Sequence, residues 1–166
     1  MQRLNLKIPV IKKASVLIID DEEGIRKLLA EILEKNDYGA DSAGDGKEGI
    51  KKSYEKFYDA AFIDIMLPDS NGIDLLPRFK ETTPRMRKII MTGNPSLQNA
   101  VAAVNKGADA YVMKPLDAEK VLATLEEQLE KQKKERETME QLFNRGRARA
   151  RIDLLNREAT EAPEVR

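Results

Sequence analysis

The sequence contains neither cysteine nor histidine among its 166 residues. Without cysteine the chain can form no disulfide bond, no thiolate metal site and no cysteine nucleophile. Without histidine it lacks the side chain that most often titrates near neutral pH, and it cannot be its own phosphohistidine donor. Any chemistry of this chain therefore rests on carboxylates, lysines and hydroxyl groups.

Two further absences concern charge and hydrophobic length. Lys and Arg together number 29, as do Asp and Glu, so bulk charge does not point to a polyanionic partner. No apolar run approaches the roughly 18–20 residues that span a bilayer. The basic N-terminus also lacks the apolar core of a signal peptide. We therefore expect a cytoplasmic protein without a membrane span.

What the sequence does contain is a regular alternation of short apolar runs and amphipathic segments. The apolar runs predict strands at residues 15–20, 38–42, 59–64, 88–91 and 110–113. The segments with helical spacing predict helices at residues 23–35, 47–56, 71–80 and 97–106, and a fifth helix from residue 117. Runs that are apolar throughout suit parallel strands buried on both faces, so the pattern predicts a doubly wound α/β fold.

The composition changes after Leu129, where charged residues dominate. We expect the fifth helix to overrun the domain by several turns and then fray, and the final stretch REATEAPEVR to be disordered. Four arginines alternate within this segment, at positions 145, 147, 149 and 151. The simplest interpretation is a solvated tail, and the alternatives are salt-sensitive binding to nucleic acid, to an acidic partner or to an anionic surface.

The predicted strands end on polar side chains. The first ends in Asp20 and Asp21, the third in Asp64, the fourth in Thr92 and the fifth in Lys114. Because functional groups of such sheets gather beyond the carboxyl ends of the strands, we expect these side chains to lie together. Clustered carboxylates need a cation, and an all-oxygen set suits Mg²⁺. A carboxylate beside Mg²⁺, an ammonium and a hydroxyl is a suitable phosphoryl acceptor.

Taken singly, these residues have plainer interpretations. Asp20 and Asp21 could cap the following helix, since acids are favourable at a helix start. Thr92 could be a turn residue, and Lys114 could extend its ammonium into water over apolar surface. Only their joint placement at the strand ends favours a functional site.

Together these positions resemble the receiver domain of two-component response regulators. The stretches VLIIDDEEGIRKLL, DIMLPDSNGIDLL, IIMTG and GADAYVMKPLD are similar to motifs of that family and stand in its order. The resemblance covers about residues 14–129 and implies a CheY-like sheet with strand order 2-1-3-4-5. It leaves an N-terminal arm at residues 1–13 and a charged helical extension with a tail at residues 130–166.

The resemblance also implies a phosphorylation site. Asp64 would accept a phosphoryl group from a histidine kinase or a phosphotransfer protein, and Lys114 would pair with that group. Mg²⁺ would be held by Asp20, Asp21 and Asp64, with the backbone carbonyl of Met66 as a further ligand.

The resemblance further implies a switch. Thr92 would reorient to bond the phosphoryl group, and Tyr111 would swing inward with it. The Lys114–Pro115 peptide bond would be cis. The sequence has Gly93 where the family often has alanine, which leaves room for the phosphoryl group.

These roles imply a signalling protein that turns over no external metabolite, and not an enzyme in that sense. Output would run through the face of helix 4, strand 5 and helix 5 and through the extended fifth helix, toward a downstream protein or a second copy. The zero net charge and the lack of a folded nucleic-acid reader weigh against nucleic acid. A phosphohydrolase of the haloacid-dehalogenase type is a rival, but Asp64-Ile65-Met66 lacks the second acid of its Asp-x-Asp motif.

Overall fold

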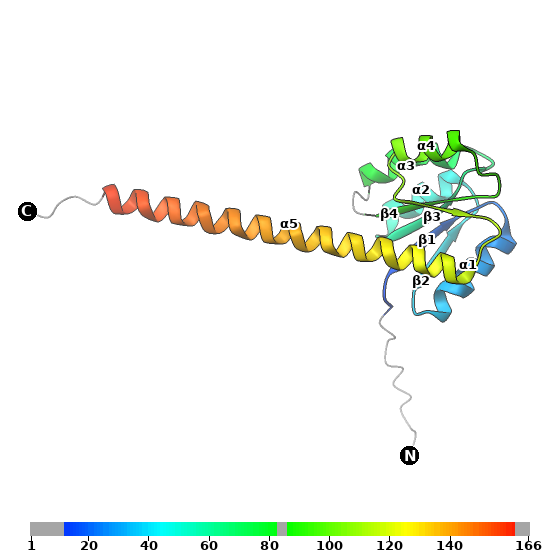
Figure 1. Ribbon diagram of the computed structural model, residues 1–166, viewed down its shortest axis with the longest axis horizontal. Helices are drawn as coiled ribbons and strands as arrows, with labels where there is room; N and C mark the ends of the chain where they lie inside the picture. Colours follow the sequence, from blue (N-terminus) through cyan, green and yellow to red (C-terminus); the bar gives the residue numbers. More distant parts are fainter. Residues whose placement is uncertain (1–11, 83–85, 162–166) are drawn as a thin grey trace, which may run out of the picture. The chain divides into compact units, whose positions relative to one another are not determined.

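Five short strands form one parallel sheet in the computed structural model of the chain (Figure 1). The structure describes residues 12–82 and 86–161, and the side chains of residues 80–82 and 157–161 lie outside this description. The strands are β1 (Ser15–Ile19), β2 (Gly39–Ala43), β3 (Ala60–Asp64), β4 (Arg87–Thr92) and β5 (Ala110–Met113). Their order, β2-β1-β3-β4-β5, confirms the predicted α/β fold and strand order.

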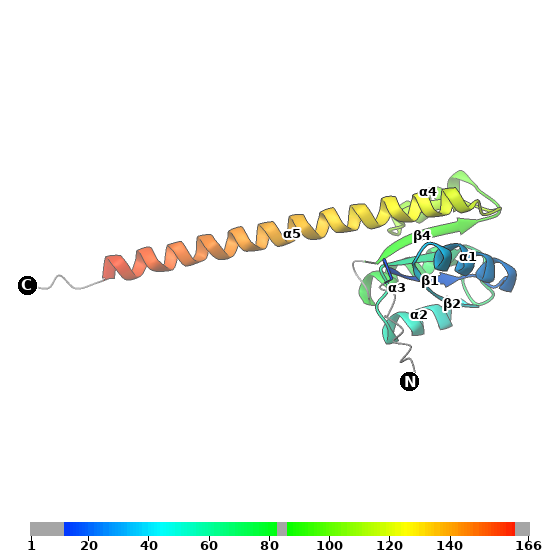
Figure 2. The same ribbon diagram turned by 90° about the horizontal axis from the view of Figure 1, so that it is seen from below.

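Helices follow every strand and lie on both sides of the sheet (Figures 1 and 2). They are α1 (Glu23–Lys35), α2 (Gly46–Glu55), α3 (Gly72–Thr82), α4 (Leu97–Asn105) and α5 (Ala118–Glu161). Side chains of α1 and of the first turns of α5 pack on one face of the sheet. Side chains of α2, α3 and α4 pack on the other.

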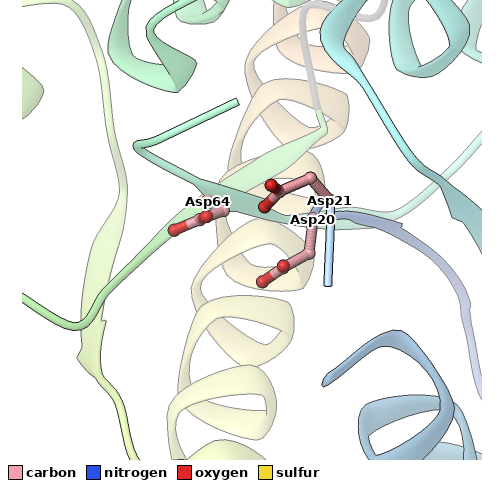
Figure 3. A group of neighbouring side chains, drawn as sticks. All are labelled: Asp20, Asp21 and Asp64. Carbon is pink, nitrogen blue, oxygen red and sulfur yellow. The ribbon is translucent and has the colours of Figure 1, made fainter. Parts of the chain in front are cut away.

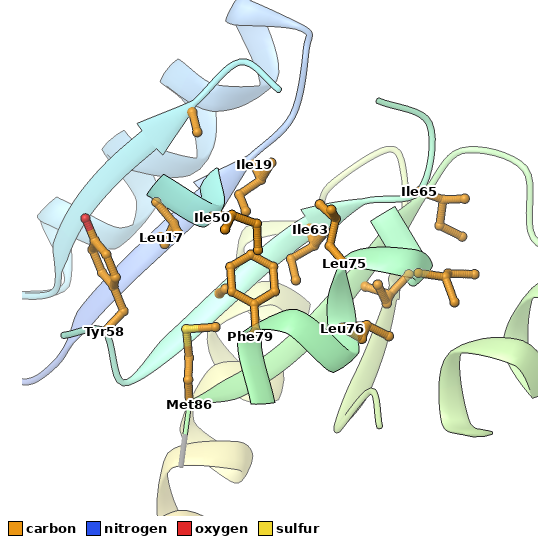
Figure 4. Packing of buried hydrophobic residues seen from close by; sticks show 14 of the residues in the cluster. Leu17, Ile19, Ile50, Tyr58, Ile63, Ile65, Leu75, Leu76, Phe79 and Met86 are labelled. Carbon is orange, nitrogen blue, oxygen red and sulfur yellow. The ribbon is translucent and has the colours of Figure 1, made fainter. Parts of the chain in front are cut away.

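The core has two halves because successive residues of a strand point to opposite faces. In β1, Val16 and Ile18 belong to one buried cluster, whereas Leu17 and Ile19 belong to the other. Figure 4 shows the second cluster, which includes Ile50 from α2 and Phe79 from α3. Burial on both faces explains why the strand sequences are apolar throughout.

Local signals place the helix that follows β4. Ser96 is the N-cap of α4, and its hydroxyl accepts a hydrogen bond from the backbone N–H of Asn99 at 3.0 Å. The helix ends before Gly107, whose φ of 94° lies in the left-handed region that glycine adopts most easily. Ser96 and Gly107 thus bound the helix that connects β4 to β5.

The chain divides into two units, Met1–Leu129 and Glu130–Arg166. The helix α5 extends to Glu161, further than the few turns that we expected beyond the domain. The extension is rich in good helix formers, it has only Gly146 as a weak point, and its single proline, Pro163, follows the helix. Residues 1–11 of the predicted arm and residues 162–166 of the predicted tail lie outside the described residues.

Within residues 12–82 and 86–161, no helix combines the length and the apolar character that crossing a bilayer requires.

Candidate functional site

Three aspartates meet at the carboxyl edge of the sheet (Figure 3). Strands β1 and β3 are paired with Ile19 opposite Ile63, so the residues that follow, Asp20 and Asp64, lie next to each other. Each of Asp20, Asp21 and Asp64 offers an oxygen within 4.8 Å of the others. Asp20 is fully buried, Asp64 is nearly so and Asp21 is exposed. The strand register therefore brings together the acids that the sequence placed at strand ends.

Lys114, which follows β5, reaches into this group of acids. Its Nζ lies 2.7 Å from Asp20 Oδ2, 3.4 Å from Glu22 Oε1 and 3.5 Å from Asp64 Oδ1. Only 12% of its side-chain surface is exposed. The peptide bond between Lys114 and Pro115 is cis. The ammonium is thus shared among acids from two strand ends.

The charges of this site leave a surplus of negative charge. Burial raises the pKa of the Asp64 carboxyl above its ordinary value; Lys114 opposes that increase and Asp20 adds to it. Burial alone would lower the pKa of Lys114, but the carboxylates of Asp20, Asp64 and Glu22 raise it above the usual value. One ammonium therefore faces several carboxylates. An all-oxygen donor set with excess negative charge fits a hard divalent cation such as Mg²⁺.

A cavity of about 340 Å³ opens beside Asp64. It is lined by Asp21, Glu22, Asp64, Met66, Thr92, Gly93, Asn94 and Lys114. Thr92 is buried at the end of β4, and its Oγ1 accepts a hydrogen bond from the backbone N–H of Asn94 at 3.1 Å. The backbone N–H of Lys114 donates to the carbonyl of Thr92 at 2.8 Å. The hydroxyl and the ammonium therefore share one small cavity with Asp64.

Tyr111 lies in β5 and is half-buried rather than part of this cavity wall. Its side chain packs against the cluster of α2, α3 and α4. Its hydroxyl oxygen is buried and has no hydrogen-bond partner among the described residues. A buried hydroxyl without a hydrogen-bond partner is unfavourable. A rearrangement that gave the Tyr111 hydroxyl a partner would therefore be stabilised.

The loop after Asp64 depends on a glycine. The backbone N–H of Gly72 donates to the carbonyl of Ile65 at 2.8 Å. A Cβ at Gly72 would lie 1.9 Å from the carbonyl oxygen of Asp64, which no side chain can occupy. The loop can therefore fold back against the end of β3 only with glycine at this position.

Asp69, in the same loop, has a role that the sequence did not reveal. Its two carboxylate oxygens accept hydrogen bonds from the backbone N–H groups of Gly46 and Lys47, each at 2.9 Å. These bonds tie the loop after Asp64 to the first turn of α2. Bonds between a loop carboxylate and backbone groups 22 or 23 residues away leave no signature in the sequence.

Arg26 is a second residue that sequence reasoning missed. Its Nη1 donates to the backbone carbonyls of Asp20 at 2.7 Å and Asp21 at 3.0 Å. The side chain therefore holds the segment that presents the two acids. Neither acid is the N-cap of α1, because Glu22 takes that position, and the Glu22 side chain makes no capping hydrogen bond. Asp20 Oδ1 instead accepts from the backbone N–H of Glu22 at 2.9 Å.

Comparison with known proteins now gives the family. The sequence model of the response regulator receiver domain matches residues 16–126. The chain belongs to this family. A similar curated protein, the response regulator ArlR of Staphylococcus saprophyticus, is 34% identical over 119 residues, which are 70% of this chain and 53% of ArlR. The receiver chain thus spans about half the length of the curated relatives that it matches.

Solved structures agree with this assignment. A CheY-like receiver domain protein from Methanospirillum hungatei is 40% identical, with a TM-score of 0.71, over 73% of this chain and 97% of that one. A response regulator from Burkholderia pseudomallei, solved with a phosphorylated aspartic acid, a calcium ion and citrate, is 30% identical with a TM-score of 0.66, over 74% of this chain and 72% of that one. The protein is a receiver domain of a two-component response regulator, as the motifs implied.

Proposed function

We propose that this receiver is switched by phosphorylation of Asp64. The observation that carries the proposal is the joint placement of Asp21, Asp64, Lys114 and Thr92 around one cavity at the carboxyl edge of the sheet, with the buried Asp20 paired to Lys114 beside it. The relative from Burkholderia pseudomallei, which carries a phosphorylated aspartic acid, supports it. The phosphoryl donor in this proposal is a separate histidine kinase or phosphotransfer protein, as in the family. This chain contains no histidine and so cannot be its own phosphohistidine donor.

The transfer uses the carboxylate as a nucleophile. An oxygen of Asp64 attacks the phosphorus atom, an oxygen–phosphorus bond forms, and the nitrogen–phosphorus bond to the donor's imidazole breaks. Lys114 Nζ, 3.5 Å from Asp64 Oδ1, is near enough to pair with the transferred group. The Thr92 hydroxyl, now held by the backbone of Asn94, supplies a hydrogen bond after a rotation about its side chain.

Asp20, Asp21 and Asp64 would hold Mg²⁺, with the backbone carbonyl of Met66 as a further ligand. When bound, the ion would offset the negative charge of the phosphoryl oxygens. The donor set supports this assignment, because three carboxylates converge within 4.8 Å and neither histidine nor cysteine is present to favour a softer metal.

Output is proposed to run through the face formed by α4, β5 and the start of α5. Four apolar side chains are exposed on α4 and β5: Leu97, Val101, Val104 and Met113. A cavity of about 740 Å³ adjoins β5 and the first turns of α5, and Tyr111 lines it. Movement of Thr92 and Tyr111 would repack this face for a downstream protein or a second copy, with no external metabolite turned over. In this scheme residues 14–129 are the receiver and residues 130–166 the extension.

Labelling with acetyl phosphate tests the site. In Mg²⁺, intact-mass spectrometry should find one phosphoryl group on the parent and none on Asp64→Asn. Asp69→Asn, whose carboxylate lies outside the cavity, is the matched control and should still be labelled. Labelling that persists in Asp64→Asn, or that is absent from the parent, would overturn the proposal.

The switch is tested separately with beryllofluoride, which stands in for the phosphoryl group on Asp64. Amide resonances of α4 and β5 should shift in the parent when beryllofluoride and Mg²⁺ are added. Thr92→Val and Tyr111→Ala should bind the mimic and lose most of that shift. If both variants respond as the parent does, the switch through Thr92 and Tyr111 is wrong.

A further inference from the structure

Four arginines stand at every second position of the helical extension, and the helix arranges them in two rows. Helix α5 runs without interruption through residues 145–151. Because successive residues of an α-helix are rotated by about 100°, Arg145 and Arg149 form one row along the helix. Arg147 and Arg151 form a second row, about 160° around the helix from the first. Two opposite sides of the same short segment are therefore basic.

The surfaces between these rows carry small residues. Gly146 and Ala150 occupy one of them, and Ala148 lies in the middle of the other. All seven residues from 145 to 151 are exposed. A helix with small residues between two arginine rows can approach another surface closely while the arginines extend on either side.

Charges earlier in α5 behave differently. Residues 126–140 contain opposite charges four residues apart, the spacing at which helical side chains attract each other. These pairs are Glu127 and Lys131, Glu130 and Lys134, Lys131 and Glu135, Lys133 and Glu137, and Arg136 and Glu140. Of these, Lys134 Nζ lies 3.6 Å from Glu130 Oε1. That part of the helix largely neutralises itself.

The arginine segment has no such compensation. Residues 141–152 contain four arginines and no acid. Only Asp153 stands four residues from one of them, Arg149, and no salt bridge joins any of the four to an acid in the part of the chain that the structure describes. Arg147 lies over the ring of Phe143, 5.6 Å from its centroid, a contact that leaves the edge of the guanidinium free to donate.

We propose that residues 145–151 of the extension bind a nucleic-acid duplex by lying in its groove. The major groove of B-form DNA is about 12 Å wide and admits an α-helix. Both of its walls carry phosphates, so a helix with arginine rows on opposite sides can pair with both strands at once. Each guanidinium matches the geometry of a phosphate group. The small residues between the rows offer no side chain that reads a base edge, so this binding is independent of sequence.

The two-sided arrangement distinguishes a groove from a flat anionic surface. A membrane or the acidic face of a protein could meet only one arginine row at a time. Within residues 145–151 the surfaces between the rows carry only glycine and alanine, and the exposed apolar side chains of Leu142, Phe143, Ile152 and Leu154 lie outside this segment. The inference goes beyond the proposed phosphorylation and does not depend on it.

Fluorescence anisotropy of the full chain with a labelled mixed-sequence DNA duplex of roughly 20 base pairs tests the proposal. Two double variants each remove one row: Arg145→Gln/Arg149→Gln and Arg147→Gln/Arg151→Gln. The control Lys133→Gln/Arg136→Gln removes the same charge from the self-compensated part of the helix. Far-UV circular dichroism verifies that all variants keep the helix.

We expect each row variant to weaken duplex binding about tenfold and the control to weaken it less than about threefold. Four phosphate contacts predict a slope of about −3.6 for log K against log salt, which either row variant should halve. A second duplex of unrelated sequence should bind equally well. Several outcomes would overturn the proposal: no duplex binding, loss through one row only, an equal loss in the control, or binding to phosphatidylglycerol vesicles but not to the duplex.

Discussion

Like charges gather at two places in this receiver chain, and the fold treats them differently. At the carboxyl edge of the sheet, Asp20 and Asp64 are buried side by side and share the ammonium of Lys114. In the extension, four arginines remain exposed and unpaired among the described residues. Strand register forces the acids together, whereas helical spacing only lines the arginines up.

The difference teaches how a charge cluster contributes to stability. Buried carboxylates repel each other strongly because water and salt screen them poorly. A change in the charge of the acid cluster therefore changes the free energy of unfolding of the domain. Exposed charges are screened by water and salt, so the arginine cluster costs the helix little. Removing charges from the sheet edge should therefore change folding, while removing them from the extension should change binding with little effect on folding.

The largest effect should follow Lys114→Met in metal-free buffer. The substitution leaves the fully buried Asp20 without its partner at 2.7 Å. Breaking a fully buried pair costs about 3–5 kcal/mol, and because this site opens to a cavity we expect about 2 kcal/mol. Urea unfolding at pH 7 with EDTA measures the loss.

Lys106→Met is the matched control, because Lys106 pairs with Asp74 on the surface, where 43% of its side chain is exposed. It should cost no more than about 0.5 kcal/mol. Added Mg²⁺ should stabilise Lys114→Met more than the parent, because the ion replaces the missing positive charge. Equal losses of unfolding free energy in Lys114→Met and Lys106→Met would contradict the distinction between buried and exposed charges.

Arg26→Gln should have the next largest effect, on metal affinity. The substitution removes the donor that holds the carbonyls of Asp20 and Asp21 at 2.7 and 3.0 Å. Residues that support metal ligands typically contribute tenfold or more to affinity, so we expect Mg²⁺ to bind about tenfold more weakly. Isothermal titration with Mg²⁺ measures this. Lys27→Gln, next in the sequence and paired with Glu23 on the surface, should bind Mg²⁺ as the parent does.

Part of this site could be predicted from the sequence and part could not. The strands and the convergence of Asp20, Asp64 and Lys114 followed from apolar runs and from the polar residues at their ends, because a parallel sheet aligns its carboxyl ends. The sheet order followed only from the resemblance to receiver domains. Such reasoning depends only on where elements begin and end.

The contacts of Arg26 and Asp69 could not be predicted in that way. Both side chains bond backbone groups of other segments, and those bonds depend on loop conformations that periodicity does not encode. The length of α5 was underestimated for a related reason. Its high charge favoured disorder by composition, whereas helix propensity and charge spacing sustain the helix to Glu161. The arginine rows become visible only with that helix in place.

The pKa of Asp64 provides a prediction about pH. Burial raises the pKa of Asp64 in the folded state, so the unfolded chain loses this proton at lower pH than the folded chain does. Between the unfolded-state pKa and the folded-state pKa, the free energy of unfolding therefore falls as pH rises. Without metal, Asp64→Asn should therefore be more stable than the parent at pH 7. This gain should disappear as the pH falls below the ordinary range of aspartate. Thermal unfolding without metal ions from about pH 3 to about pH 8 measures it.

Asp41 should behave in the opposite way and serves as the comparison. The hydrogen bonds from Lys56 and then Tyr58 outweigh burial and lower the pKa of its carboxyl. Its stabilisation is present above the unfolded pKa and is lost as pH falls through the folded pKa. Asp41→Asn should therefore lose stability at neutral pH, and the loss should shrink in acid. A gain in both variants would mean that burial, rather than pairing, dominates at both sites.

The smallest effects should appear in the helicity of the extension, and they should have opposite signs. Glu130→Gln removes the attraction to Lys134 at 3.6 Å, so it should weaken the helix by about 0.3–0.5 kcal/mol. Arg151→Gln removes the repulsion from Arg147, four residues before it, so it should strengthen the helix by a similar amount. Far-UV circular dichroism of the full chain during heating at low salt should resolve the two, and about 1 M salt should abolish both differences. If Arg151→Gln weakened the helix instead, the arginines would stabilise the helix itself. Their presence at positions 145–151 would then be explained without a binding partner.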